Sequence, residues 1–308
     1  MASKKVAVIG AGYVGSSIAY ALTLKEIAQE IVLIDIEHEK AKGEAMDIVH
    51  GIPYMGNTVV YPGDYSDCRD CSLIIITVGK NRKRGQSRLD LLEENTDILK
   101  NVAENIMQFY NGGVILVVSN PVDMMTCKMT EWCGLDDGKI LGTGCILDTS
   151  RLVGQLASYL RLSTDSIHAM VVGEHGDFQM PVWSRVMIGN APIAEYCHMM
   201  EVPWNDQIQQ QIFEIVLRMG AEIISRKERT HFGIATCVCY LAESIIYNQD
   251  IVVPVSSVLR GEYDISGVAL SVPSILAGQG IKKRLVERWA EQEIKFIQTC
   301  AERMRRLL

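Results

Sequence analysis

His175 is the residue whose type and setting most favour chemistry. It lies in the segment Val-Gly-Glu-His-Gly-Asp at residues 172–177. Glycines on both sides free the backbone to present the imidazole into a cleft, and a neutral imidazole near pH 7 can accept the proton of an alcohol. A lone histidine is more often a packed or exposed residue, so this interpretation depends on a partner for the ring.

Asp148 and Arg151 offer that partner and a site for an anion. Asp148 stands where a helix is expected to begin, and its carboxylate can hold one tautomer of the imidazole and stabilise the imidazolium. Arg151 follows about one helical turn later, on nearly the same face, and its planar guanidinium matches a substrate carboxylate. Taken alone, Asp148 would be an N-cap and Arg151 a surface cation.

A glycine-rich turn near the N-terminus predicts a dinucleotide site. Gly10, Gly12 and Gly15 follow an apolar run and precede a helix-forming segment. The first glycine permits a tight turn, the second lets the backbone approach a pyrophosphate, and the third allows close helix packing. Asp35 ends the next apolar run, where a carboxylate can bond the ribose 2′-OH of NAD and repel the 2′-phosphate of NADP. We expect NAD as the cofactor, with a merely structural glycine turn as the alternative.

The elements that must hold these residues alternate along the first half of the chain. Four apolar runs without polar alternation are typical of buried parallel strands, at residues 6–9, 31–34, 73–78 and 114–118. Helical patterning lies between them, at residues 16–26 and 89–109. A further short run at 140–141 precedes a long helix expected at 148–160. We expect an α/β protein whose residues 1–143 form a Rossmann domain with a doubly wound parallel sheet.

The second half differs, and we expect residues 144–308 to form a mixed α+β catalytic domain. Its strand-like runs are separated by Gly, Pro and charged turns, at residues 169–172, 182–188, 251–259 and 267–272. Two long helical patterns cover residues 204–225 and 282–308. No low-complexity linker separates the halves, so they are expected to pack together.

Composition narrows the choice of partners and location. With 30 basic and 37 acidic residues the formal charge is −7, which gives no global field for nucleic acid or an anionic membrane. Basic residues at 282–284 and 303–306 have acidic neighbours and predict a solvated helix face. The apolar runs fall short of the ~20 residues that cross a bilayer, and the start lacks a signal-peptide pattern. Nine cysteines, an odd number, suit reduced thiols and a cytoplasmic location.

In their order along the chain, these motifs resemble the NAD-dependent lactate and malate dehydrogenases. The similarity extends over nearly the whole chain. Besides the glycine loop it includes Ser-Asn-Pro-Val-Asp at 119–123, Gly-Cys-Ile-Leu-Asp-Thr-Ser-Arg at 144–151 and Gly-Glu-His-Gly-Asp at 173–177. The segments 181–184 and 227–235 look like the L-lactate dehydrogenase branch in particular.

The resemblance implies a role for each site residue in hydride transfer between NADH and a small 2-oxo acid. His175 would donate and accept the proton, Asp148 would orient it, and Arg151 would anchor the substrate carboxylate. Arg88 would polarise the substrate carbonyl, and Asn120 would lie near the nicotinamide and the substrate oxygen. The family also implies a homodimer or a homotetramer.

The expected lid, residues 79–88, departs from the family pattern. Arg82 stands where lactate dehydrogenases carry Gln and malate dehydrogenases of this family carry Arg, and Arg84 replaces an expected Pro. A guanidinium there can pair with a second substrate carboxylate but would be unpaired over the methyl of pyruvate, so Arg82 favours oxaloacetate and malate. Thr230, which resembles a pocket-wall residue, and the lactate-like body of the chain favour the alternative, an L-lactate dehydrogenase with an unusual lid.

Regulation and other function classes have weaker signals. His168 matches a histidine that helps to bind fructose 1,6-bisphosphate in many bacterial lactate dehydrogenases, but Val153 occupies the position of the companion arginine, so activation is not expected. A non-enzymatic dinucleotide-binding protein would have no reason to keep the catalytic set. A thiol-redox role for Cys68 and Cys71 is disfavoured because no helix N-terminus is expected beside them. No metal site is expected, since no His or Cys pair has ligand spacing.

Overall fold

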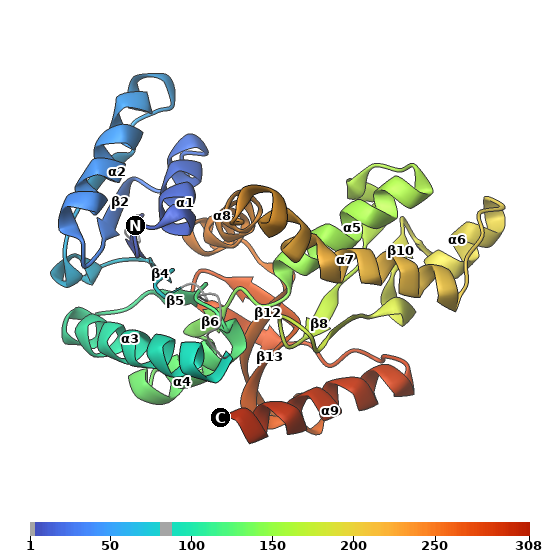
Figure 1. Cartoon of the computed structure of the whole chain (residues 1–308). Coiled ribbons are helices and arrows are strands. Elements are labelled where there is room, and N and C mark those ends of the chain that lie inside the picture. Colours follow the sequence, from blue (N-terminus) through green and yellow to red (C-terminus); the bar gives the residue numbers. More distant parts are fainter. Residues whose placement is uncertain (1–3, 81–87) are drawn as a thin grey trace.

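Parallel strands form the core of the first half of the chain (Figure 1). The computed structural model describes residues 4–80 and 88–308, with the backbone alone for residues 88–92. In spatial order the strands are β3 (Val59–Pro62), β2 (Glu30–Ile34), β1 (Lys5–Ile9), β4 (Leu73–Ile76), β5 (Val114–Val117) and β6 (Ile140–Gly142). This is the doubly wound Rossmann order, so the expected fold class is confirmed.

Helices cover both faces of this sheet, so its central strands are buried on both sides. Along β1, Val6 and Val8 enter one hydrophobic core while Ala7 and Ile9 enter the other, as the two-residue period of a strand requires. The first face packs against α1 (Tyr13–Leu24), α2 (His38–Gly51) and α8 (Phe232–Tyr247), and the second against α3 (Arg88–Phe109) and α4 (Val122–Cys133). Of these, α2, α4, α8 and strand β3 were not predicted from the sequence.

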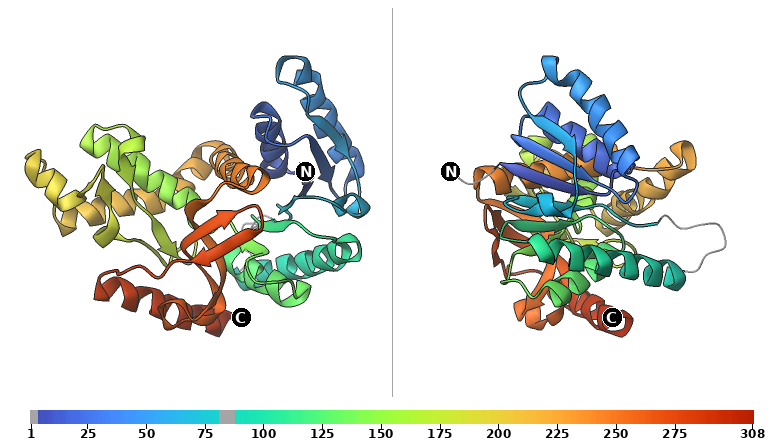
Figure 2. Two further views of the ribbon diagram at one scale, coloured as in Figure 1. Left: turned by 180° about the vertical axis from the view of Figure 1, so that it is seen from behind. Right: turned by 90° about the vertical axis from the view of Figure 1, so that its left-hand side faces the viewer.

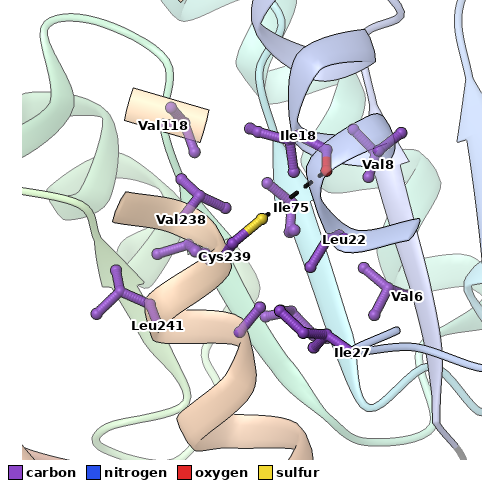
Figure 3. Close-up of a cluster of buried hydrophobic side chains, with 14 of the residues drawn as sticks. Val6, Val8, Ile18, Leu22, Ile27, Ile75, Val118, Val238, Cys239 and Leu241 are labelled. Carbon is purple, nitrogen blue, oxygen red and sulfur yellow. Dashed lines mark hydrogen bonds between the residues drawn. The ribbon is translucent and has the colours of Figure 1, made fainter. Parts of the chain in front are cut away.

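The two halves of the chain share a hydrophobic core. Helix α8 comes from the second half, yet Val238 and Leu241 lie in the same buried cluster as Ile18 and Leu22 of α1 (Figure 3). The thiol of Cys239 lies 4.0 Å from the carbonyl oxygen of Ile18, which marks how closely the two helices approach. The two halves are therefore packed into one body, as the absence of a linker predicted.

Antiparallel strands extend the sheet into the second half. Strand β12 joins β6 through the pairing of Ser256 with Gly142. The added strands are β12 (Ile251–Arg260), β13 (Ser266–Ala277), β8 (Val171–Gly173), β9 (Gln179–Pro181) and β14 (Gly280–Arg284). A smaller sheet contains β7 (Ile167–His168), β10 (Met187–Ile188) and β11 (Ala191–Pro192).

The remaining helices flank this second half. They are α5 (Ile146–Leu160), α6 (Ile193–Met199), α7 (Asp206–Lys227) and α9 (Glu291–Leu307). Figure 2 shows α9 in red below the β12–β13 hairpin, on the side of the molecule opposite α2. Short 3-10 turns occur at Ile52–Tyr54, Tyr65–Cys68, Thr164–Ser166, Trp183–Arg185 and Glu262–Asp264.

The predicted strand over residues 182–188 is wrong. Only β10 is extended there, and a 3-10 turn precedes it. The reason lies in the backbone hydrogen bonds of this segment: Ser184 N donates to the Glu293 carboxylate at 3.0 Å, and Arg185 N donates to the Val182 carbonyl at 3.0 Å. These bonds close a turn onto α9 and leave no ladder for a strand.

The predicted helix over residues 282–308 is also wrong in its first third. Residues 280–284 form β14, which pairs with β13, and the helix begins only at Glu291. Arg284 explains the difference, because its side chain is 5% exposed and bonded within the sheet rather than solvated. Its guanidinium pairs with both oxygens of Asp137 at 2.8 and 2.9 Å, and its Nε donates to Ser257 at 2.7 Å.

The Arg284 pairing predicts a stability difference between two arginines that share one carboxylate. Arg284→Ala should lower the free energy of unfolding by about 2–4 kcal/mol, because it removes a buried charge-assisted network. Arg260→Ala is the matched control, since Arg260 is 55% exposed and approaches Asp137 only to 3.6 Å; its cost should stay below about 1 kcal/mol. Urea denaturation measures both, and equal losses would contradict the structural role of Arg284.

Candidate active site

The glycine loop has the geometry of a phosphate cradle. A Cβ on Gly15 would lie 1.8 Å from the carbonyl oxygen of Gly10, so only glycine permits this approach of α1 to the turn. A Cβ on Gly12 would meet no described atom of the chain within 4 Å, so the backbone faces open space there. In the described part of the chain, no side chain caps the start of α1, which leaves its first N–H groups for an anion. These features fit a dinucleotide pyrophosphate.

Asp35 lies against this loop at the end of β2. Its Oδ2 accepts a hydrogen bond from Ala11 N at 2.6 Å, and its Oδ1 accepts one from Glu37 N at 2.9 Å. The two bonds fix the carboxylate beside the turn that follows β1. Each oxygen keeps a further lone pair for a hydroxyl donor, as the ribose of NAD requires.

The His175 loop is a tight connection between β8 and β9. Gly173 adopts a φ of +100°, and a Cβ there would lie 2.6 Å from the Phe178 carbonyl oxygen, which accepts a bond from Glu174 N at 2.9 Å. Glycine at this position therefore closes the loop. The closed loop presents His175 with a side chain that is 26% exposed.

Asp148 lies between His175 and Arg151 and contacts both. The Nδ1 atom of His175 lies 2.6 Å from Asp148 Oδ2, and Arg151 Nη1 donates to Asp148 Oδ1 at 3.0 Å. Asp148 and Arg151 lie one turn apart on α5, which begins just after β6. The carboxylate is 1% exposed. One buried anion is thus shared by an imidazole and a guanidinium.

These contacts shift the protonation of both partners. Burial lowers the pKa of His175, but the hydrogen bond and the negative charge of Asp148 raise it by more, so the net pKa lies above its ordinary value. Burial raises the pKa of Asp148, but the bond from His175 and the charges of His175 and Arg151 leave it below its usual range. The pair is therefore suited to a charged imidazolium beside a permanent carboxylate.

Asn120 and Thr230, two further substrate-site residues expected from the sequence, lie in segments between secondary-structure elements. Asn120 follows β5 and precedes a cis peptide bond to Pro121, and its carbonyl accepts a bond from Asn95 at 3.2 Å. Thr230 lies between α7 and α8, both of which contact α5. Arg88 is the first residue of α3. Arg82 lies outside the described residues.

Contacts that the sequence analysis missed join the Thr230 segment to the glycine loop. The guanidinium of Arg229 lies 3.9 Å from the centre of the Tyr13 ring, and the rings of His231 and Tyr13 are 5.9 Å apart. Because Tyr13 is the first residue of α1, the segment that carries Thr230 lies beside the expected phosphate cradle. Long-range stacking of this kind leaves no periodic signal in a sequence.

The competing site types receive no support from the geometry. Burial raises the pKa of Cys68 and Cys71 to about 12, so neither thiol is poised as a nucleophile. In the described part of the chain, no group of three His, Cys, Asp or Glu side chains could hold a metal ion. Across the same residues, no helix has the length and apolar character to span a bilayer.

Comparison with known proteins gives the family. The sequence model of the lactate/malate dehydrogenase NAD-binding domain matches residues 4–142, and that of the alpha/beta C-terminal domain matches residues 145–307. The chain belongs to the lactate/malate dehydrogenase family. It is an NAD-dependent 2-hydroxy acid dehydrogenase, which confirms the expected cofactor, enzyme class and resemblance.

Relatives of this dehydrogenase cover its whole length. An L-lactate dehydrogenase of Acetivibrio thermocellus is 37% identical over 99% of this chain and 96% of its own, and one of Lactococcus lactis subsp. cremoris is 36% identical over 99% and 98%. Among solved structures, a minor L-lactate dehydrogenase from Enterococcus mundtii superposes with a TM-score of 0.96 at 34% identity, covering 100% of this chain and 98% of the other. A lactate dehydrogenase from a Medee basin deep-sea metagenome also gives 0.96, at 35% identity over 99% and 98%. These names favour the L-lactate alternative over the malate preference.

The geometry of this dehydrogenase predicts a pKa change on neutralising Asp148. In Asp148→Asn the pKa of His175 should fall by about one unit or more, because the partner charge that raises it is lost. An NMR titration of the His175 ring proton measures the shift. Asp165→Asn, which removes an exposed carboxylate, is the control and should leave it in place. An unchanged His175 pKa in Asp148→Asn would show that the pair does not set its protonation.

Proposed function

We propose that the protein is an L-lactate dehydrogenase, which interconverts pyruvate and L-lactate with NADH. The observation that carries the proposal is the buried cluster of His175, Asp148 and Arg151 in a chain whose full-length relatives have that name. The cluster combines a proton carrier with a cation suited to a carboxylate, and both groups are needed for a 2-oxo acid.

In this proposal His175 exchanges the proton on the substrate oxygen through its Nε2, because Nδ1 faces Asp148. Asp148 fixes the tautomer and stabilises the imidazolium, as its lowered pKa supports. Arg151 uses one N–H for Asp148 and offers the rest of its fork to the substrate carboxylate. Arg88 polarises the carbonyl, a role that follows from the family resemblance.

The cofactor site would use Gly10, Gly12 and Gly15 for the pyrophosphate and Asp35 for a ribose hydroxyl. Asn120, in the segment that follows β5, would lie near the nicotinamide of the bound cofactor. NAD supplies the hydride chemistry when it is bound, while the chain binds and orients. Thr230 would form a wall of the pocket beside the substrate side chain.

A malate dehydrogenase is the second candidate, and Arg82 is the observation that favours it. A guanidinium over the C3 substituent can bind the second carboxylate of oxaloacetate with two charge-assisted hydrogen bonds. Against it, the matched relatives named here are lactate dehydrogenases. We propose pyruvate as the principal substrate and oxaloacetate as one that Arg82 allows.

The assembly, location and division of the chain belong to the same proposal. We infer a homodimer or homotetramer from the family resemblance, and a cytoplasmic location from nine free, buried cysteines, which suit a reducing compartment. Residues 1–143 would bind NAD and residues 144–308 would carry the catalytic groups. Fructose 1,6-bisphosphate is still expected to have little effect, because Val153 packs beside a hydrophobic cluster and offers no cation.

The first test removes the proposed proton carrier. His175→Asn should bind NADH with a near-normal Kd, measured by fluorescence, but lose about 10²–10⁴ in turnover of pyruvate, the usual contribution of a positioned acid or base. His38→Asn, which changes an exposed histidine, is the control. Near-normal turnover in His175→Asn would remove this residue from the mechanism.

The second test compares kcat/KM for pyruvate and oxaloacetate. The unmodified enzyme should prefer pyruvate, and Arg82→Gln should lower kcat/KM for oxaloacetate about tenfold or more without lowering that for pyruvate, because only the dicarboxylate loses an ion pair. Lys83→Gln removes the same charge from the adjacent position and should leave kcat/KM unchanged for both pyruvate and oxaloacetate. A tenfold preference of the unmodified enzyme for oxaloacetate would replace our proposal with the malate candidate.

A further inference from the structure

Asp123 is a buried carboxylate that the mechanism above does not use. It is 2% exposed and lies in the first turn of α4, three residues after Asn120. A carboxylate in such a position costs free energy unless hydrogen bonds or opposite charges satisfy it. Its partners therefore indicate what it does.

Those partners tie Asp123 to the catalytic loop. Its Oδ2 accepts a hydrogen bond from the backbone N of His175 at 2.7 Å, and its Oδ1 accepts one from the Ser256 hydroxyl at 2.5 Å. Helix α4 belongs to the first half of the chain, whereas Ser256 lies in β12 of the second. The carboxylate of Asp123 thus links α4 in the first half to the backbone of His175 and to Ser256 in the second half.

Asp123 also acts on the charge of the imidazole. Burial raises its own pKa to about 6, although bonds from Ser256 and from His175 N oppose the rise. Its negative charge raises the pKa of His175, in addition to the effect of Asp148. Two other charged groups act on this pair: Arg151 lowers the pKa of His175, and Glu174 raises that of Asp123. The nearby thiols of Cys127, Cys145 and Cys300 have their own pKa values raised by the charge of Asp123.

We propose that Asp123 is a positioning residue for the dehydrogenase reaction, which fixes the backbone of His175 and sets the pH range over which its ring holds a proton. The inference rests on the role of His175 in the proposed function. A carboxylate that served only as a tether would affect stability and turnover, but it would not move the pH profile.

The test exploits this difference. Pyruvate reduction needs a protonated donor, so kcat/KM falls at alkaline pH as His175 loses its proton. Asp123→Asn keeps an oxygen for His175 N and an amide group that can donate to Ser256, but it removes the charge. The alkaline limb of the profile should therefore move to lower pH by about 0.5–1 unit. The Kd for NADH, measured by fluorescence, should stay within about twofold.

Two further variants keep the result interpretable. Ser256→Ala leaves the carboxylate but removes a donor to it, which raises the pKa of Asp123 and should move the limb in the same direction by less. This variant decides the question if Asp123→Asn does not fold. Asp165→Asn also removes one negative charge, but from an exposed position, and should leave the limb in place.

The outcomes separate this inference from the proposed function. If His175→Asn retains turnover, the proposed role of His175 fails, and the inference fails with it. If His175→Asn is inactive but Asp123→Asn and Ser256→Ala both keep the limb of the unmodified enzyme, the inference alone is overturned. A displaced limb with intact NADH binding supports it.

Discussion

The site is organised around the charge of Asp148. A carboxylate that is 1% exposed is stable as an anion only when donors or cations satisfy it. His175 and Arg151 do so from opposite oxygens, and the cost of separating either from the carboxylate keeps both in place. The same electrostatic demand that holds the cluster together raises the basicity of the imidazole. The charge of Asp148 therefore both stabilises the cluster and raises the pKa of His175.

The continuous sheet brings Asp148 on α5 close to His175 on the β8–β9 loop. Parallel strands of an open α/β sheet end at one edge, and α1 and α5 both begin there, after β1 and β6. The antiparallel extension through β12 then places the β8–β9 loop against α5. A Cβ on Gly142 would lie 2.3 Å from the Thr126 hydroxyl of α4 and 3.3 Å from the Cβ of Ser256 in β12, so a larger residue has little room where β6 meets β12.

Residues with a local signal could be predicted from the sequence, and those whose role depends on tertiary contacts could not. The strands from β1 to β6, apart from β3, are apolar runs that can be recognised from their composition alone. The glycine turn can be recognised from the spacing of its three glycines. Helix α8 has an apolar composition, and three of its exposed residues, Phe232, Tyr240 and Tyr247, are aromatic, so its 3.6-residue pattern is weak. From the sequence, Arg284 was predicted to be a solvated cation, because its partner Asp137 is distant in the sequence and lies beside it only in the folded chain. Asp123 was visible within a motif, but its bond to His175 exists only in the folded chain.

The net charge of −7 and an anionic cofactor are compatible because attraction in this protein is local. At physiological salt the Debye length is about 8 Å, so distant acidic residues act weakly on a bound phosphate. The start of α1 presents N–H groups, and Arg229 holds its guanidinium over Tyr13 at that same turn. Arg151 places a second cation beside Asp148, and its side chain is 16% exposed and therefore little screened. The net charge of the chain therefore places no limit on anion binding, because groups that act at short range decide it.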